Sequence, residues 1–210
     1  MATVISPPEP RTILHNISWA TYEGLLADHE NSNAARFTYD RGTLEIMILS
    51  AKHEKPNRTI SLLVELIAEE MEVDVENFGS TTFKREDLLR GFEPDTCFYI
   101  QNLARIEGKD EIDLTVDPPP DLIIEIDITH SSLDKLPIYA QIGAPEVWRY
   151  DGTKLAIFRL VSDAYVERDE SGVLPRLASA DISRFIEDSK SLRRTAWVRS
   201  VRGWARAHKS

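Results

Sequence analysis

The sequence predicts a mixed α/β fold built around a central sheet, and three observations support this class. Residues 56–73 carry apolar side chains at helical spacing. Residues 121–128, DLIIEIDI, form the kind of apolar run that is typical of a buried central strand. Between and after these segments, β-favouring runs alternate with helical patterns. The order is hairpin, helix, three strands, helix and strand, followed by a C-terminal helical extension.

Length and composition indicate one globular domain over residues 1–210. The chain is 42% hydrophobic and 29% charged, which excludes collagen-like and wholly disordered classes. No apolar run approaches the roughly 18 to 20 residues of a membrane helix, and the first residues do not resemble a secretory signal. A single cysteine, Cys97, excludes an internal disulfide and a cysteine-based zinc cluster. We therefore expect a cytoplasmic protein without a membrane partner.

Local signals justify the elements of the first half of the chain. Ser18 is well placed to cap a helix that begins at Trp19. Arg41-Gly42 separates two β-favouring runs and predicts a hairpin turn. The expected segments, in order, are a loose N-terminus (1–12), a helix after Ser18, a hairpin (36–40 and 43–49), a helix (56–73) and two strands (75–83 and 93–100).

The second half begins with three prolines, which prevent continuation of a strand or helix into residues 121–128. Ser131 or Ser132 can cap the next helix, Pro137 suits its first turn, and Gly143 suits its end. The expected segments are a strand (121–128), a helix (133–142), strands (146–151, 154–161 and 164–169), a short helix (182–189) and a basic helix (190–210).

Charge is unevenly distributed along the chain. The formal net charge is −10, yet residues 190–210 hold seven basic residues and no acidic one. In the basic amphipathic helix expected there, Arg199, Arg202 and Arg206 are candidate nucleic-acid contacts, because a row of guanidinium groups can follow a phosphate backbone. The alternative is a helix that docks through its tryptophan stripe or forms a dimer contact.

Carboxylates inside the apolar run are the unusual feature of this sequence. Asp121, Glu125 and Asp127 share one face because their spacings are even. Unpaired buried acids cost on the order of several kcal/mol, so they need exposure, a cation or a metal. Asp121 lies about 13 Å from Glu125 along a strand, whereas Asp95 on the preceding strand could lie about 4.8 Å from Glu125. Asp95 and Glu125 are therefore the candidate ligands of Mg²⁺ or Mn²⁺, and Asp121 is expected to cap the proline-rich start of its strand.

Several motifs together resemble one protein family. They are a strand that begins Glu-Pro-Asp at 93–95, a Pro-Asp strand that carries Glu125, and the run SSLDKLPIYAQIGAPEVW at 131–148. The segments TYDRGTLEIM and LSAKHEKPNRTI are also similar to that family. Residues 19–151 thus resemble the Uma-two family of restriction-endonuclease-like proteins in the PD-(D/E)xK nuclease superfamily. The resemblance implies an α-β-β-β-α-β core and Mg²⁺-dependent hydrolysis of DNA phosphodiester bonds.

The resemblance also implies roles for single residues. Asp95 matches the first motif acid, and Glu125 matches the acid of the D/E-x-K element. Asp127 stands where that element has lysine; it could hold a second ion or a water, but it cannot stabilise charge that builds on a phosphate. Lys135, on the first turn of the following helix, is the nearest replacement for the lysine.

Glu45 and His53 match two further family positions, and Glu45 is expected to line the site. Other interpretations stay open. Asp95 and Glu125 could be structural acids paired with cations, and Lys135 could be a surface partner of Asp134. The missing motif lysine favours a non-catalytic binding or assembly module as the alternative function. A homodimer is expected if both strands of a duplex are cut, because two strands need two sites.

Overall fold

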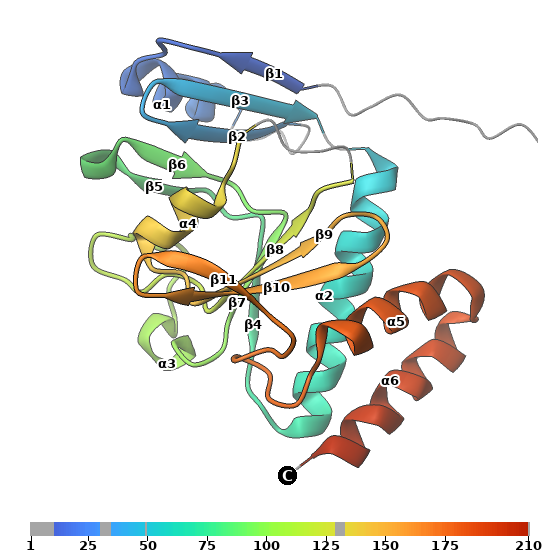
Figure 1. The fold of residues 1–210 in the computed structure, drawn as a ribbon. Coiled ribbons are helices and arrows are strands. Elements are labelled where there is room, and N and C mark those ends of the chain that lie inside the picture. The colour runs from blue at the N-terminus through green and yellow to red at the C-terminus, as the bar shows by residue number, and fades with distance from the viewer. Residues whose placement is uncertain (1–10, 30–34, 49, 129–132, 210) are drawn as a thin grey trace, which may run out of the picture.

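The computed structural model describes residues 11–29, 35–48, 50–128 and 133–209, which form two β-sheets and six α-helices (Figure 1). The five-stranded sheet has the order β1 (Arg11–Leu14), β3 (Thr43–Ile48), β2 (Ala35–Asp40), β6 (Arg90–Phe92) and β5 (Phe83–Arg85). The six-stranded sheet has the order β11 (Ala164–Arg168), β10 (Leu155–Val161), β9 (Glu146–Tyr150), β8 (Leu122–Ile126), β7 (Thr96–Tyr99) and β4 (Glu76–Gly79). The helices are α1 (Trp19–Asp28), α2 (Ala51–Met71), α3 (Leu103–Ile106), α4 (Leu136–Ile142), α5 (Ser179–Ser191) and α6 (Arg194–His208).

The six-stranded sheet contains the expected core order. α2, β4, β7, β8, α4 and β9 come in this order along the chain, as α-β-β-β-α-β. Between them, β5 and β6 join the other sheet, and the short helix α3 lies between β7 and β8. β7 pairs antiparallel with β8, and β8 pairs parallel with β9 after a crossover through α4. The predicted mixed α/β class is confirmed.

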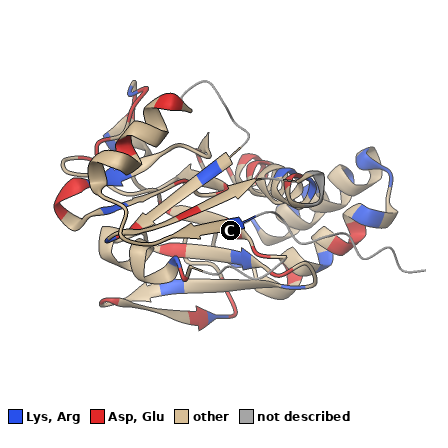
Figure 2. Cartoon of the chain, turned by 90° about the horizontal axis from the view of Figure 1, so that it is seen from above, with Lys and Arg blue, Asp and Glu red and all other residues tan. Residues whose placement is uncertain are grey.

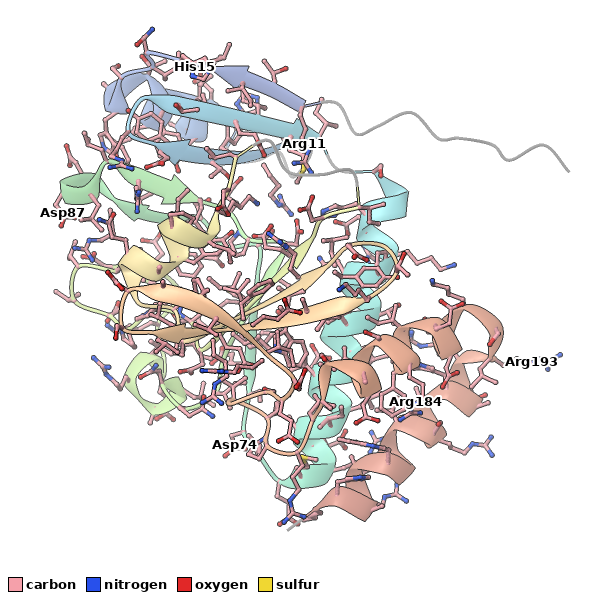
Figure 3. The ribbon with its side chains drawn as sticks, in the orientation of Figure 1. Arg11, His15, Asp74, Asp87, Arg184 and Arg193 are labelled. Atoms are coloured by element: carbon pink, nitrogen blue, oxygen red, sulfur yellow. The ribbon has the colours of Figure 1, made fainter. Side chains whose placement is uncertain are left out.

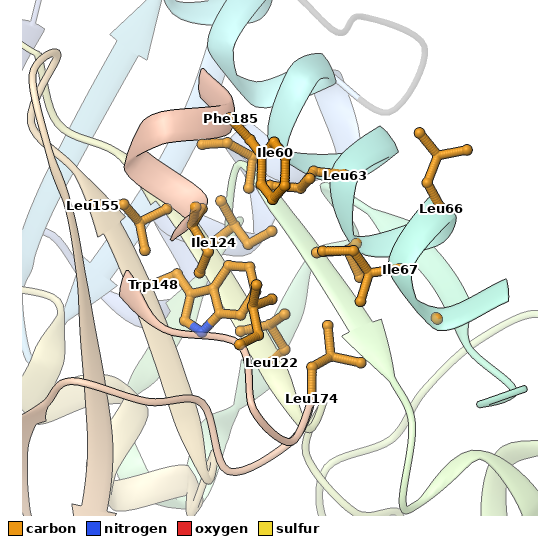
Figure 4. Close-up of a cluster of buried hydrophobic side chains, with 14 of the residues drawn as sticks. Ile60, Leu63, Leu66, Ile67, Leu122, Ile124, Trp148, Leu155, Leu174 and Phe185 are labelled. Carbon is orange, nitrogen blue, oxygen red and sulfur yellow. The ribbon is translucent and has the colours of Figure 1, made fainter. Parts of the chain in front are cut away.

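The two faces of β8 pack into separate hydrophobic clusters, as the alternation along this strand predicts. Leu122 and Ile124 pack against α2 and against Trp148 of β9 (Figure 4). Ile123 belongs to the second cluster, on the side of α4. Each fully buried aliphatic side chain of this kind contributes about 1.5–3 kcal/mol. Glu125 follows Ile123 by two residues, so its side chain lies on the α4 side of the sheet.

The N-terminal elements form as local signals predict, with one difference. The Ser18 hydroxyl caps α1 by accepting a hydrogen bond from the Thr21 amide at 3.1 Å. The turn between β2 and β3 has positive φ at Arg41 (46°) and Gly42 (92°), as a two-residue hairpin turn of this kind requires. The expected loose N-terminus extends to residue 12, whereas β1 begins at Arg11 and pairs with β3. A four-residue edge strand has too few positions to show a periodic pattern.

The segment 75–83, predicted as one strand, is divided in the structure. β4 and β5 lie in different sheets because the chain turns at Gly79, whose φ is 58°. β5 then pairs with β6 through a 3₁₀ turn at Glu86–Leu88. β6 was not predicted, since three residues around Gly91 carry no strand alternation.

The two helices that flank the site begin at other residues than predicted. α2 begins at Ala51, five residues before Pro56, because the Ser50 hydroxyl accepts a hydrogen bond from the backbone of the first turn. α4 begins at Leu136 rather than at residue 133, and Pro137 lies in its first turn as predicted. The predicted caps Ser131 and Ser132 lie outside the described residues.

The basic C-terminal segment belongs to two helices rather than one. α5 ends at Ser191 and α6 begins at Arg194. The prediction of one helix that begins at residue 190 is therefore wrong, because the first residues of that range belong to α5. Extended backbone at Leu192 and Arg193 separates the two helices. Trp197 and the apolar face of α6 are buried in the cluster that covers α2. In the part of the chain described here, no helix is long and apolar enough to cross a membrane.

Arg202 and Arg206 pair with acidic residues of α2. Arg202 lies 2.7 Å from Glu69 and 2.6 Å from Glu70, and Arg206 lies 2.7 Å from Glu70. Arg199 is exposed. Lys and Arg segments recur along both C-terminal helices (Figure 2). These ion pairs support the docking interpretation, and a nucleic-acid role for the three arginines stays a prediction.

Candidate active site

Asp95 lies directly before β7, and Glu125 lies on the neighbouring strand β8. β7 and β8 pair Thr96 with Ile124, and one further step in this antiparallel register places Asp95 opposite Glu125. Directly opposite residues of an antiparallel pair point to the same face, with Cβ atoms about 4.5–5.5 Å apart. The register therefore brings the two candidate ligands together.

Residues of α2 and β8 hold Asp95. Its Oδ2 lies 3.0 Å from Nε2 of His53 and accepts a 2.7 Å hydrogen bond from the Ile126 amide. The Asn57 side-chain amide donates to the Asp95 carbonyl at 2.9 Å, one turn after His53 on α2. Burial opposes ionisation of Asp95, but the hydrogen bond and charge of His53 lower its pKa below the usual value. Asp95 is therefore a carboxylate.

Tyr139 of α4 and Lys135, the N-cap residue directly before this helix, hold Glu125. Lys135 Nζ donates to Glu125 Oε2 at 2.8 Å, and the Tyr139 hydroxyl donates to Glu125 Oε1. Burial and the Asp95 charge raise the pKa of Glu125, and Lys135 opposes this rise. Burial disfavours a charged Lys135, yet the Glu125 and Asp95 carboxyl groups outweigh it and raise the pKa of the ammonium. Lys135 therefore stays charged beside the two acids.

The segment before α4 places Lys135 at the N-cap of this helix. Asp134 Oδ1 accepts a hydrogen bond from the Leu136 amide at 3.2 Å, and Glu45 Oε2 accepts one from the Leu133 amide at 3.1 Å. Glu45 is buried on β3 and lies 3.7 Å from the Arg11 guanidinium of β1. Glu45 thus connects the five-stranded sheet to the segment that carries Lys135.

A pocket of about 320 Å³ lies beside Glu125. Its charged lining consists of Arg11, Glu125, Asp127, Asp134, Lys135 and Arg149. Arg149 is the β9 residue paired in register with Glu125, and its guanidinium lies 5.2 Å from the Phe158 ring centroid. Figure 3 shows Arg11 directed from the five-stranded sheet toward the six-stranded sheet. The lining therefore combines three cations with three acids, so it offers groups both for a metal ion and for an anionic ligand.

The other two acids of residues 121–128 lie apart from each other. Asp127 lines the pocket, and its Oδ1 is buried with no hydrogen-bond partner among the residues described. Asp121 instead accepts hydrogen bonds from the Ile100 amide at 2.7 Å and the Asn102 amide at 2.9 Å. Asp121 thus caps the backbone that follows β7 rather than the prolines before β8, and these hydrogen bonds do not involve Asp95 or Glu125.

Sequence reasoning missed four contributors to the site: Arg11, Asn57, Tyr139 and Arg149. Helical spacing could have found two of them, because Asn57 follows His53 by four residues and Tyr139 follows Lys135 by four. Arg149 depends on the parallel register between β8 and β9, and Arg11 depends on the pairing of β1 with β3. Neither register is visible in a local pattern.

The donor atoms at this site fit a hard divalent cation. Mg²⁺ prefers oxygen ligands and is commonly held by one or two carboxylates, with water and phosphate oxygens completing its shell. Asp95 Oδ1 is buried and has no hydrogen-bond partner within the described ranges, as a ligand oxygen kept available for a cation would be. Those ranges contain no group of three or more His, Cys, Asp and Glu side chains that could hold a metal ion. The protein would therefore supply two carboxylates, from Asp95 and Glu125.

An α-β-β-β-α-β core in which Asp95 lies opposite Glu125, with Lys135 directly before α4, is the arrangement that the resemblance to restriction-endonuclease-like proteins implied. The family model described as "Uma2: Putative restriction endonuclease" matches residues 19–189, and the chain belongs to this family. The resemblance predicted over residues 19–151 is thus confirmed, and the match extends through β11 into α5.

The solved structures that are similar to this chain include one that matches most of its length. It is a crystal structure described as a putative nuclease belonging to DUF820 from Anabaena variabilis, with a TM-score of 0.50 and 17% sequence identity. The similarity covers 71% of this chain and 90% of that one, and at this identity it supports the fold alone. No curated protein matches the chain.

Proposed function

We propose that this chain is a divalent-metal-dependent nuclease that hydrolyses phosphodiester bonds in DNA. The observation that carries the proposal is the 2.8 Å contact between Lys135 and Glu125, beside Asp95 of the neighbouring strand. Asp127 stands at the motif position that resembles that of a lysine. Lys135, directly before α4, would supply the positive charge of that lysine instead. Membership of a family described as restriction endonucleases supports the reaction class.

Asp95 and Glu125 would hold Mg²⁺ or Mn²⁺, and the bound cation would lower the pKa of a water molecule and offset phosphate charge. His53 keeps Asp95 ionised, and Tyr139 orients Glu125. Asp95 Oδ1 has no hydrogen-bond partner among the described residues, so it is the oxygen available to a cation.

Lys135 and the two arginines of the pocket act on the substrate in this proposal. Lys135 Nζ orients the attacking water and stabilises negative charge that develops on the phosphate oxygens. Arg11 and Arg149 donate hydrogen bonds to the oxygens of the same phosphate. Cleavage of both strands of a duplex needs two such sites, so a homodimer on the DNA is part of the proposal.

One observation favours a second candidate, a non-catalytic module with a nuclease fold. Asp127 replaces the motif lysine, and the pocket holds three acids beside its three cations. In such a module the contacts of Glu125 with Lys135 and Tyr139 would serve stability alone.

The test is cleavage of supercoiled plasmid DNA with Mg²⁺ or Mn²⁺ by the full chain and by Asp95→Asn, Glu125→Gln and the exposed control Asp163→Asn. We expect cleavage by the parent and by Asp163→Asn, and loss of cleavage in the other two. Calorimetric titration with Mn²⁺ should show binding by the parent that Glu125→Gln weakens. If the parent is folded but does not bind metal and does not cleave DNA, the non-catalytic module is favoured.

A further inference from the structure

Two adjoining hollows form one groove between α2 and the C-terminal helices. The larger, of about 770 Å³, lies between α2 and the junction of α5 with α6. The smaller, of about 300 Å³, reaches the ends of β8 and β9. Both are lined by Lys55, Thr59 and Ser189, so a continuous surface leads from α6 to the ends of β8 and β9. We call this surface the helical groove.

The helical groove is cationic on a chain whose net charge is −10. Its exposed basic residues are Lys55, Arg58, Lys190 and Arg194. Glu54 is the acidic residue among those that line it, at 3.5 Å from Arg58. Lys190 lies 2.6 Å from Glu187, an exposed residue outside the lining. Arg193 projects at the corner between α5 and α6 (Figure 3), which adds a further cation at this end.

The helical groove reaches the same end of β8 as the candidate active site, but from the α2 face of the sheet, whereas the active-site pocket lies on the α4 face. Ile128 lines the smaller hollow, and Asp127, directly before it, lines the active-site pocket. α2 connects the two regions as well. On its buried side His53 and Asn57 hold Asp95, while Lys55 and Arg58 are exposed on the groove side of the same two turns. One helix therefore sets the distance between the groove cations and the candidate ligands.

We infer that the helical groove binds the sugar-phosphate backbone of the nucleic-acid strand whose scissile phosphate lies in the active-site pocket. This inference rests on the proposed function. The negative net charge repels a polyanion over most of the surface, so a strand that passes around the end of β8 would follow the cationic groove on the α2 face. Contacts of lysine and arginine with phosphates give affinity and position without reading the base sequence.

The test measures binding of a short duplex DNA by fluorescence anisotropy at several salt concentrations, with EDTA present so that the wild-type chain does not cleave. Wild type is compared with the triple variant Lys55→Ala, Arg58→Ala, Arg194→Ala. The matched control, Arg41→Ala, Lys84→Ala, Arg168→Ala, removes the same charge from exposed residues of other elements. For the groove variant, the loss of three phosphate contacts should make the slope of log affinity against log salt less negative by about 2 to 3. Its binding at about 0.1 M salt should be roughly a hundredfold weaker than that of wild type.

Two results would overturn the inference: equal losses of affinity in the groove variant and the control, or no binding of DNA by wild type. The proposed function can fail independently. Groove-dependent binding without cleavage under any metal would reject the nuclease and retain the groove. Cleavage by wild type with equal binding by both triple variants would reject the groove and retain the nuclease. Circular dichroism melting checks that the three proteins are equally folded.

Discussion

Lys135 and Glu125 form an ion pair of 2.8 Å, although they are ten residues apart and belong to different elements. Their side chains are only 9% and 11% exposed. A buried ion pair of this kind adds little stability relative to apolar residues of similar size, because both charges lose their hydration. A buried pair at the edge of a pocket, beside the second buried acid Asp95, is better explained by the proposed reaction than by stability.

Replacing Lys135 by alanine removes the cation proposed to stabilise the transition state. We expect the rate of plasmid cleavage to fall about a hundredfold to a thousandfold, as for the loss of comparable charge-stabilising donors. Mn²⁺ binding, measured by calorimetry, should be retained because both carboxylates remain. Lys154→Ala, at an exposed residue between β9 and β10, is the control. Equal cleavage by Lys135→Ala and the parent would show that this lysine is not catalytic.

A lysine restored at the motif position should partly replace Lys135. Asp127 lines the same pocket and lies two residues after Glu125 on the same strand face. In the Lys135→Ala background, Asp127→Lys is therefore expected to recover cleavage by about tenfold or more, relative to Lys135→Ala alone. Asp127→Ala in that background controls for removal of the acid. If cleavage does not recover, a lysine at position 127 does not reach the reacting phosphate, and the position of Lys135 before α4 is required.

His53 holds a buried carboxylate, so its loss should destabilise the fold. Removing one partner of a buried pair leaves an uncompensated charge, and His53→Ala is expected to cost about 3–5 kcal/mol of unfolding free energy. His15→Ala, at an exposed residue, should change it by less than about 0.5 kcal/mol. Urea unfolding of both variants at neutral pH gives the comparison. A similar small change in both variants would rule out this role for His53.

Tyr139 combines a packed ring with a hydroxyl that donates to Glu125. Tyr139→Phe keeps the ring, whose centroid lies 4.9 Å from that of Phe92, and removes only the donor. Leaving the buried carboxylate oxygen without this donor should cost about 1–3 kcal/mol. It should also raise the pKa of Glu125 further and weaken Mn²⁺ binding, because protonation competes with the metal. The measurement is Mn²⁺ affinity of Tyr139→Phe and of the parent between pH 5 and 8. Equal affinities of the two proteins over this range would contradict the prediction.

The docking of α6 on α2 should weaken in acid. Hydrogen bonds from Arg206 and Arg202 lower the pKa of Glu70 from 4.5 to about 2. A group with a lowered folded-state pKa stabilises the fold above its unfolded pKa, and this contribution is lost as the pH falls toward the folded pKa. The difference in unfolding free energy between the parent and Glu70→Gln should therefore be constant above about pH 5 and shrink between pH 4.5 and 2. A difference that is independent of pH would show that these ion pairs do not couple α6 to α2.

Local patterns predicted the elements best where each carries its own signal. Ser18 and the Arg41-Gly42 turn act through neighbouring backbone groups, and both form as expected. Strand alternation likewise placed Glu125 on the face opposite Leu122 and Ile124. The predictions were wrong for 75–83, where one alternating run is shared by two sheets, because pairing partners rather than alternation decide where a strand ends.

The sequence by itself determined which acids share a face and which of them could reach one another, because side-chain direction along a strand follows from backbone geometry alone. It also determined that the motif lysine is absent at Asp127. Only the tertiary structure decided that Lys135 takes a place beside Glu125, that His53 holds Asp95, and that Arg11 and Arg149 line the same pocket. Such contacts join elements distant in the chain, and they depend on strand register and on how α2 and α4 pack against the sheet.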